Sequence, residues 1–314
     1  MLCRICKDRG KRNKAVIFLR HHRLALCEKH FLEWFEKQVE KTIKKFRMFT
    51  REETVLVAVS GGKDSLSLWK VLIALGYKTL GLHINLGIER WNYSKTSEEI
   101  CREFAEKNGA ELVVFSLKER FGFSIEEIAR GAKRKDVCSV CGTFKRYVMN
   151  LVAKERGINV IATGHNLDDE AALLLSNTMR WEIGYLGRQS PVLPEEAGFP
   201  KKVKPFAFQT EKETVSYAIL NGIRFMETGC PNAKESTSKT FKRALAMIEH
   251  EMPGTKLRFY KEFLKKAKPL FEKELKKELE LRRCAECGMP TTQEICSVCS
   301  ILKRVRENAK SRDN

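Results

Sequence analysis

Residues 54–65 read TVLVAVSGGKDS, and this stretch decides the fold. Residues 54–60 form a continuous β-branched and apolar run, which predicts a strand covered on both faces. Two glycines allow a sharp turn, and residues 64–76 then carry leucines at helical spacing, which predicts a helix that ends at Gly76. A strand, a tight turn and a helix in this order are the opening unit of a parallel α/β sheet.

Strand and helix patterns continue to alternate after this unit. Strands are predicted at 79–85, 111–116 and 159–163. Helices are predicted at about 94–108, in a stretch that ends at residue 155, and in a stretch that begins after Asn166, the expected N-cap. Such alternation predicts βαβ units, and ligands of such sheets bind beyond the carboxyl ends of the strands. Beyond residue 210 the pattern is helical, at 211–221, 236–251 and 255–280, the last broken at Pro269.

The turn after the first strand has the composition of an anion cradle. Its amides and the helix N-terminus behind them favour phosphate, and Lys63 adds a mobile positive charge. The glycine spacing fits neither a Walker A loop nor a dinucleotide-binding fingerprint. The alternative is an ordinary turn of small residues, which explains the SGGKDS sequence less well.

A second motif, GHNLDDE at residues 164–170, follows the fourth predicted strand. Three carboxylates in the first turn of a helix can simply favour the helix dipole. They are also hard oxygen donors that can hold Mg²⁺ on ATP phosphates. We favour the second interpretation, because the motif leaves the sheet at the same edge as the phosphate loop.

Composition limits the class of protein. The chain has 314 residues, 43% of them hydrophobic, and 59 Lys+Arg against 40 Asp+Glu give a net charge of +19. It can therefore bury a core, and the positive excess predicts a polyanionic partner, nucleic acid being the commonest. No apolar run reaches the ~18 residues of a membrane span, and the N-terminus lacks the apolar stretch of a secretory signal. We expect no membrane association and a cytoplasmic location, where paired cysteines are metal ligands before they are disulfides.

Two sets of residues have the spacing of structural zinc sites. The first combines a CxxC pair with a later CxxH pair, and the second has two CxxC pairs. The predicted zinc ligands are Cys3, Cys6, Cys27 and His30 in the first set and Cys284, Cys287, Cys296 and Cys299 in the second. Closed four-ligand sites of this kind stabilise small modules that have little core.

Three further cysteines lack an evident fourth ligand. Cys138 and Cys141 are one helical turn apart, and Cys230 precedes Pro231, as the last cysteine of many iron–sulfur ligand runs does. Three interpretations stay open: a cluster with one open iron, a redox-active dithiol with Cys230 buried, or a zinc site that recruits Cys101 or His165. Otherwise Cys101 is expected in the core.

The SGGKDS loop resembles the PP-loop of the ATP pyrophosphatase superfamily. Together with GHNxDD, the central CxxC, the distant Cys-Pro, LALCEKHFLEWF and GMPTT, it makes essentially the whole chain similar to the TtcA/TtuA family of tRNA 2-thiouridine synthetases. The resemblance implies an α/β, parallel-sheet PP-loop core, adenine nucleotide alpha hydrolase-like, flanked by N- and C-terminal zinc fingers. It implies ATP, Mg²⁺, two Zn²⁺ and a [4Fe–4S] cluster. The implied reaction adenylates the C2 oxygen of a tRNA uridine, T-loop 5-methyluridine, and replaces that oxygen with sulfur.

The same resemblance assigns roles to residues. Cys138, Cys141 and Cys230 would hold the cluster, and Lys145 and Asp169 would assist the two thiols of the CxxC at the reacting centre. For Lys145 the alternative is a solvated helix lysine, and for His83 a structural histidine at a strand end. The residues expected to hold ATP and its magnesium are Ala58, Ser60, Gly61, Gly62, Lys63, Asp64, Ser65, His83, Ile84, Gly164 and Asp169.

The resemblance further implies a ubiquitin-like thiocarboxylated sulfur carrier and a homodimer. We expect four regions: a zinc finger at 1–35, a PP-loop domain with the iron–sulfur site at 36–230, a basic helical region at 231–283, and a zinc finger with a basic tail at 284–314. Residues 1–51 hold fifteen Lys+Arg against five Asp+Glu, and residues 256–283 hold eleven against five, which favours contact with the tRNA backbone over a merely solvated face.

Competing functions are thiolation of a wobble uridine or an anticodon-loop cytidine, a PP-loop ligase without sulfur transfer, and a zinc-stabilised RNA-binding protein with a regulatory nucleotide loop.

Overall fold

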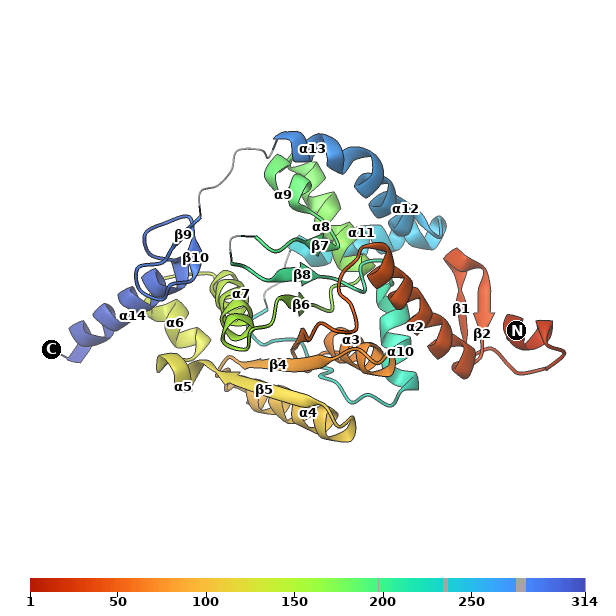
Figure 1. The fold of residues 1–314 in the computed structure, drawn as a ribbon, viewed down its shortest axis with the longest axis horizontal. Helices are drawn as coiled ribbons and strands as arrows, with labels where there is room; N and C mark the ends of the chain where they lie inside the picture. The colour runs from red at the N-terminus through yellow and green to blue at the C-terminus, as the bar shows by residue number, and fades with distance from the viewer. Residues whose placement is uncertain (197, 234–236, 275–280, 314) are drawn as a thin grey trace.

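The computed structural model describes residues 1–196, 198–233, 237–274 and 281–313. Within them, the central sheet has the strand order β5-β4-β3-β6-β8-β7 (Figure 1). The four predicted strands are present as β3 (Val55–Val59), β4 (Thr79–Asn85), β5 (Glu111–Ser116) and β6 (Val160–Ala162). They pair in parallel, and so does β8 (Lys201–Val203) with β6, which confirms the parallel α/β core.

The sheet extends beyond the predicted strands at one edge. There β7 (Val192–Leu193) pairs antiparallel with β8. Both strands are very short and are flanked by prolines and lysines, so neither an apolar run nor an alternation marks them in the sequence.

Alternating side chains of β3 divide the core into two parts. Its valines face the cluster that includes α2 (Glu28–Lys45), α3 (Lys63–Ala74) and α4 (Tyr93–Lys107). Its Leu56 faces the cluster with α6 (Ile125–Gly131), α7 (Val137–Glu155) and α14 (Ser297–Asp313). Helices thus cover both faces of the sheet, as a continuous apolar strand requires.

Helices follow the sheet, as predicted. Those predicted beyond residue 210 are α10 (Glu211–Leu220), α11 (Thr237–Glu251), α12 (Thr255–Glu262) and α13 (Lys268–Glu274). Before β7 lie α8 (Leu167–Met179), which was predicted after Asn166, and α9 (Ile183–Arg188), which was not predicted. A π-helical segment, η3 (Phe263–Ala267), joins α12 to α13 without a gap, so Pro269 lies within a continuous helical path and its missing N–H leaves a carbonyl of the π-helical turn without its helical partner. The irregularity thus precedes the proline. The predicted helix start at 236 and helix end at 275–280 lie outside the described residues.

Small modules occupy the two ends of the molecule (Figure 1). The first contains α1 (Arg4–Asp8), β1 (Ile17–Leu19), η1 (Arg20–His22) and β2 (Leu24–Leu26), and the last contains β9 (Arg282–Arg283), β10 (Pro290–Thr291) and α14. The other short helices are η2 (Arg90–Asn92) and α5 (Leu117–Phe121). Helix α2 runs from the first module into the main core, across residue 35. Among the described helices, none has the length and apolar character needed to span a bilayer.

Candidate active site

The phosphate loop joins β3 to α3 and is held in shape by its own bonds. The Ser65 hydroxyl accepts a hydrogen bond from the Ser60 amide at 3.1 Å and donates one to the Gly62 carbonyl at 3.0 Å. Gly61 has a φ of +77°, and a Cβ there would stand 3.0 Å from the Ser97 carbonyl oxygen. Only glycine meets both conditions, so the loop has its conformation before a ligand binds.

A cavity of about 320 Å³ opens beside this loop, beyond the carboxyl ends of β3, β4 and β6. The predicted ATP-binding residues that line it are Ala58, Ser60, Gly62, Asp64, Ser65, His83, Ile84 and Gly164, together with the predicted catalytic Lys145. Lining residues that the sequence did not single out are Val59, Leu82, Leu86, Tyr93, Ser94, Ser97, Met149 and Thr163. His165 also lines the cavity, where burial lowers its pKa.

Gly164 brings the fourth strand against the phosphate loop. A Cβ on this residue would lie 2.9 Å from the Asp64 carbonyl and the Ser65 amide nitrogen, both backbone groups. Two segments that are far apart in the sequence therefore contact each other through backbone atoms, with no side chain between them. This contact explains why the GHNLDDE motif begins with glycine.

His83 is a neutral, buried side chain at the end of β4. Its Nδ1 donates to the Val59 carbonyl at 3.1 Å, and burial lowers its pKa. Its Nε2 has no partner among the described residues, so an acceptor is left at the wall of the cavity.

Cys101 lies 3.4 Å from His83 Nδ1 and is fully buried, and burial raises the pKa of its thiol to about 12. It belongs to the core on the α3 and α4 side of the sheet, whereas Cys141 packs on the α7 side. The sheet therefore separates Cys101 from the central cysteines. It is a core residue, as expected, and not a fourth ligand.

Lys63 is paired with acids. Its Nζ lies 3.0 Å from Asp64 Oδ2 and 2.8 Å from Glu211 Oε1. Burial alone would lower the pKa of Lys63, but the two carboxylates raise it. The other oxygen of Asp64 accepts a hydrogen bond from the Thr214 hydroxyl at 2.6 Å. Asp64 and Glu211 thus offer adjacent carboxylates, the hard donors that Mg²⁺ prefers, next to the phosphate loop.

Asp169 belongs to the same series of paired acidic and basic side chains as Lys63 and Glu211, and it does not line the cavity. Its Oδ1 is 2.5 Å from Lys242 Nζ, which is also 3.6 Å from Glu211 Oε2. Burial would raise the pKa of Asp169, but Lys242 holds it below the ordinary range. Asp169 also completes a capping box with Asn166, so the acidic motif caps α8 and at the same time faces the site. No local motif marks Lys242 or Glu211, which reach the site from α11 and α10.

The three central cysteines converge at the start of α7. The Cys138 thiol donates to the Asn232 carbonyl at 3.3 Å, which ties α7 to the loop that follows Cys230. Burial raises the pKa of Cys141, and the nearby Cys230 and Cys138 raise it further, while Lys145 lowers it. All three thiols therefore lie in one neighbourhood, with Lys145 joining it to the cavity.

The central cysteines are spread more widely than the two predicted zinc quartets. In the part of the chain that the structure describes, groups with all ligand atoms within 4.8 Å include both quartets but not these three thiols. A four-iron cluster fits this wider spacing, because each cysteine binds a different iron. With three cysteines, one iron has no protein ligand.

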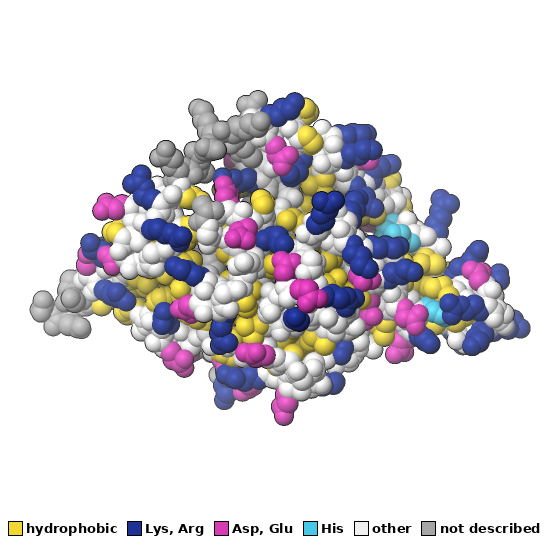
Figure 2. Space-filling view, in the orientation of Figure 1, with side chains coloured by type: hydrophobic (Ala, Val, Ile, Leu, Met, Phe, Trp, Pro, Cys, Tyr) yellow, Lys and Arg dark blue, Asp and Glu magenta, His cyan; other side chains and the backbone are white. Residues whose placement is uncertain are grey.

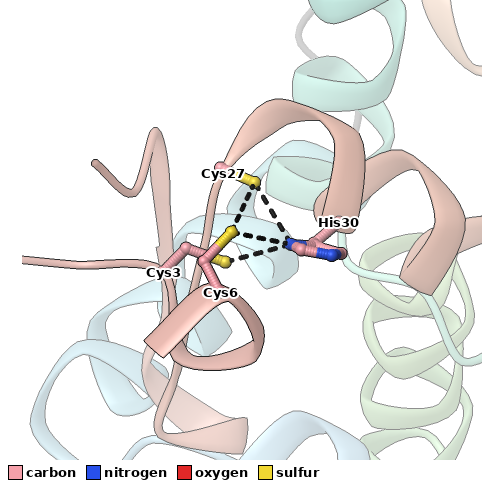
Figure 3. A group of neighbouring side chains, drawn as sticks. All are labelled: Cys3, Cys6, Cys27 and His30. Carbon is pink, nitrogen blue, oxygen red and sulfur yellow. Dashed lines mark hydrogen bonds between the residues drawn. The ribbon is translucent and has the colours of Figure 1, made fainter. Parts of the chain in front are cut away.

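The first predicted zinc site is assembled as expected (Figure 3). His30 Nδ1 lies 3.3 Å from the sulfurs of Cys3, Cys6 and Cys27, and the Cys6 and Cys27 sulfurs are 3.8 Å apart. Two thiolates at ~2.3 Å from one tetrahedral zinc stand about 3.8 Å apart, so the four ligands fit Zn²⁺.

The second quartet has the same dimensions. Cys287 and Cys296 have sulfurs 3.8 Å apart, and the Cys296 amide donates to the Cys284 sulfur at 3.2 Å. Burial would raise the pKa of Cys284, but backbone amides lower it to about 6, which favours the thiolate that zinc requires. The donor set of four sulfurs again suits a closed Zn²⁺ site.

The parallel sheet and the glycine loop with its cavity define a PP-loop ATP-binding protein. A family model described as "PP-loop domain" matches residues 31–227, and one described as "2-thiouridine synthetase TtuA, N-terminal LIM domain" matches residues 2–32. The chain belongs to the family of tRNA-5-methyluridine(54) 2-sulfurtransferases.

Its relatives are similar over their whole length. The Thermus thermophilus enzyme of that name is 48% identical over 99% of this chain and 94% of its own. The Thermotoga maritima enzyme of that name is 44% identical over 96% of this chain and 97% of its own. A solved structure, the U34-tRNA thiolase NcsA from Methanococcus maripaludis with its [4Fe–4S] cluster, superposes with a TM-score of 0.79 at 25% identity, over 96% of each chain. The resemblance seen in the motifs is confirmed.

Proposed function

We propose that this chain is an ATP-dependent tRNA sulfurtransferase that replaces the C2 oxygen of T-loop 5-methyluridine with sulfur. The position of α7 carries the proposal. Its first turns hold Cys138 and Cys141, and Lys145, one turn further on, lines the cavity beside the phosphate loop. One helix thus connects a thiolate site with a nucleotide site, which neither a PP-loop ligase nor a simple RNA-binding protein needs.

In the first half of the reaction, the uracil C2 oxygen attacks the α-phosphate of ATP. A new P–O bond forms, the bond to the β-phosphate breaks, and pyrophosphate leaves. The amides around Gly61 and Gly62 and the hydroxyl of Ser60 are placed to hold the pyrophosphate. Lys63 would turn from Asp64 and Glu211 to the phosphates, and the freed carboxylates would hold Mg²⁺.

In the second half, a sulfur nucleophile attacks C2, the C–O bond breaks, and AMP leaves. When bound on Cys138, Cys141 and Cys230, a [4Fe–4S] cluster supplies an iron without a protein ligand, at which sulfur can be held. Lys145 is a cation beside both sites and is suited to neutralise the phosphate oxygens of the leaving AMP. Asp169, kept ionised by Lys242, is suited to accept the uracil N3 proton.

Further parts of the proposal concern assembly. The sulfur donor is a ubiquitin-like protein with a C-terminal thiocarboxylate, and the enzyme works in the cytoplasm as a homodimer. Exposed apolar side chains on the adjoining helices α8, α9 and α11 and their connections support self-association: Leu173, Met179, Trp181, Tyr185 and Met247. We also keep, as part of the proposal, the division of the chain into four regions with boundaries after residues 35, 230 and 283.

The experiment combines metal analysis with nucleoside analysis. The protein is purified without oxygen, assayed for iron and sulfide, and incubated with unmodified tRNA, ATP and a sulfide source. The Cys138→Ala/Cys141→Ala variant should lose both iron and thiolation, whereas Cys101→Ala, which changes a core thiol, should keep both. Full thiolation by the double variant would exclude the proposed mechanism.

Mass analysis of the digested tRNA identifies the target. The relative with a solved structure is a U34 thiolase, so the wobble position is the specific alternative. A 2-thio group at nucleotide 54 of the tRNA supports the T-loop assignment. A 2-thio group at nucleotide 34 would instead assign the enzyme to the wobble position.

A further inference from the structure

Helix α7 separates the cavity beside the phosphate loop, which we call the ATP cavity, from a second, larger cavity. Lys145 and Met149 line the first, and Arg146 and Asn150 line the second. The second cavity measures about 660 Å³ and is lined by residues of α7, the β7–β8 hairpin, α9 and α13, of which α9 and α13 lie side by side in Figure 1. This size is within the range of about 300–1,000 Å³ typical of ligand pockets. We call it the hairpin pocket.

Lys202 occupies an inward position of the sheet in this pocket. Its register partner on β6 is Ile161, which is fully buried in the core beneath α7. Its partner on β7 is Leu193, which is 37% exposed, and because side chains paired in register point to the same face, the half-buried Lys202 stands at the edge of the core. Burial lowers its pKa, and the neighbouring Arg146 lowers it further. A lysine in this position is costly unless something neutralises it.

The charge of the pocket is not balanced by the protein. Lys268 is paired with Glu272, but Arg146, Arg188 and Lys202 make no ion pair with any described carboxylate. Glu196 is the second carboxylate of the lining, so four cations stand against two carboxylates around this cavity. The positive excess favours an anion with several oxygens, such as a phosphodiester.

Other lining groups suit a nucleotide. Asn150 is 6% exposed, and its Oδ1 has no hydrogen-bond partner among the described residues, so its amide is available to a base edge. Phe199 offers a ring, over which Lys202 Nζ lies at 5.5 Å from the centroid. Rings of this kind stack with bases in RNA-binding proteins.

Arg146 connects the pocket to the reacting centre. It is adjacent to Lys145 along α7, and its guanidinium lies over Gly142, the residue next to Cys141, where a Cβ would stand 3.3 Å from Arg146 Nη1. A phosphate on Arg146 would therefore place the RNA backbone at the edge of the central cysteines.

We propose that the hairpin pocket binds one nucleotide of the RNA substrate, with its phosphate on Arg146, Arg188 and Lys202, next to the uridine that is modified. The inference rests on the proposed tRNA sulfurtransferase function and adds the subsite that holds the flanking nucleotide. A target base must leave its stack to react, which costs a few kcal/mol, and a fixed neighbouring phosphate would help to offset that cost.

The test measures tRNA affinity against salt concentration for Lys202→Gln and Arg188→Gln, with Lys95→Gln as the matched control. Lys95 lies on α4, on the opposite face of the sheet, and its side chain is 78% exposed. An unmodified tRNA transcript is titrated with the full-length protein between ~50 and ~200 mM salt. Each pocket variant should bind the tRNA about fivefold more weakly than the wild type, and the slope of log affinity against log salt concentration should be smaller by ~0.9. ATP affinity should not change, because neither side chain lines the ATP cavity, and the unfolding temperature should not fall, because the free protein does not neutralise these charges.

The outcomes separate the two proposals. If wild-type protein binds no tRNA, the proposed function fails. If wild type and both pocket variants bind tRNA with equal affinity and slope, only the hairpin pocket fails. An equal loss in Lys95→Gln, or a loss confined to sulfur transfer from a carrier protein with tRNA binding intact, also overturns the assignment of RNA to this pocket.

Discussion

Lys242 controls the charge of the candidate active site although it lies more than seventy residues beyond the acidic motif. It bridges Asp169 and Glu211, and Lys63 bridges Glu211 and Asp64, so two lysines alternate with three carboxylates beside the phosphate loop. Burial would lower the pKa of Lys242, but Asp169 raises it, and the same contact lowers the pKa of Asp169. The ionisation of the predicted catalytic acid thus depends on a helix outside the predicted PP-loop domain.

Replacing Lys242 by Met should shift the pH profile of thiolation. Without the ammonium, burial dominates, the pKa of Asp169 rises, and this carboxyl is protonated at pH values where it is now ionised. The acidic limb of kcat/KM should therefore move to higher pH. Lys239→Met, on the exposed surface of the same helix, is the control. An acidic limb in the same place in both variants would contradict the role given to Lys242.

Gly164 allows a second test at the level of single residues. A methyl group there would press on the backbone of Asp64 and Ser65 at 2.9 Å, so Gly164→Ala must displace the phosphate loop. Overpacking of this kind costs about 1–3 kcal/mol, which as lost ATP affinity is about 5- to 150-fold. Gly184→Ala, where a Cβ meets nothing within 4 Å, should bind ATP as the wild type does in calorimetric titration. Equal ATP affinity in both variants would disprove the close contact.

At the level of elements, α12 is attached to α8 by buried polar groups. Glu170 of α8 is 1% exposed, and its carboxylate contacts the Tyr260 hydroxyl at 3.0 Å and Lys204 Nζ at 2.7 Å. Burial raises the pKa of Tyr260 well above its ordinary value, with Glu170 as the second cause, so the hydroxyl stays protonated and donates. A helix whose sequence suggests a basic surface is therefore attached to α8 by Tyr260 and by Lys256, whose Nζ lies 2.5 Å from Asp168 Oδ1.

Tyr260→Phe should lower the free energy of unfolding by about 1–2 kcal/mol, because Oε2 of the buried Glu170 carboxylate loses one of its two donors and keeps only Lys204 Nζ, at 2.9 Å. Urea denaturation followed by circular dichroism measures this change. Tyr185→Phe is the matched control, since the Tyr185 side chain is 68% exposed. If the two substitutions have the same effect, the buried hydrogen bond contributes nothing measurable.

Elements with a local signal were predictable from the sequence, and elements without one were not. The strand before SGGKDS and the parallel sheet follow from continuous apolar runs, and both zinc quartets follow from cysteine spacing. Strands β7 and β8 hold together by pairing alone, and Lys242, Glu211 and the hairpin pocket arise from segments distant in sequence. Tertiary contacts of this kind leave no periodicity that a single sequence can show.

At the level of the whole molecule, the basic start of the chain and the basic helix α12 lie side by side. Residues 1–51 and 256–283 are at opposite ends of the sequence, yet His22 and Lys45 line the same hollow as Leu257 and Lys261, between α2 and α12. Figure 2 shows lysines and arginines gathered over this region and the first module. The last module, residues 284–314, carries only five Lys+Arg against four Asp+Glu. From the sequence, basic segments near both ends of the chain were expected to contact the tRNA. In the structure, the start of the chain and α12 instead form one basic side.

This arrangement predicts where salt-dependent tRNA binding originates. Burial lowers the pKa of Lys261, and repulsion from Lys45 lowers it further, so a phosphate between these two lysines would relieve an unfavourable contact. Lys45→Gln/Lys261→Gln should lower the log–log slope of tRNA binding against salt by ~1.8, the value for two lost phosphate contacts. Lys303→Gln/Arg304→Gln removes the same charge from exposed positions of α14, at the end of the molecule opposite the first module in Figure 1, and should lower the slope less. Anisotropy titrations over a salt series give both slopes, and equal slopes for the two double variants would mean that total charge, rather than this basic side, holds the RNA.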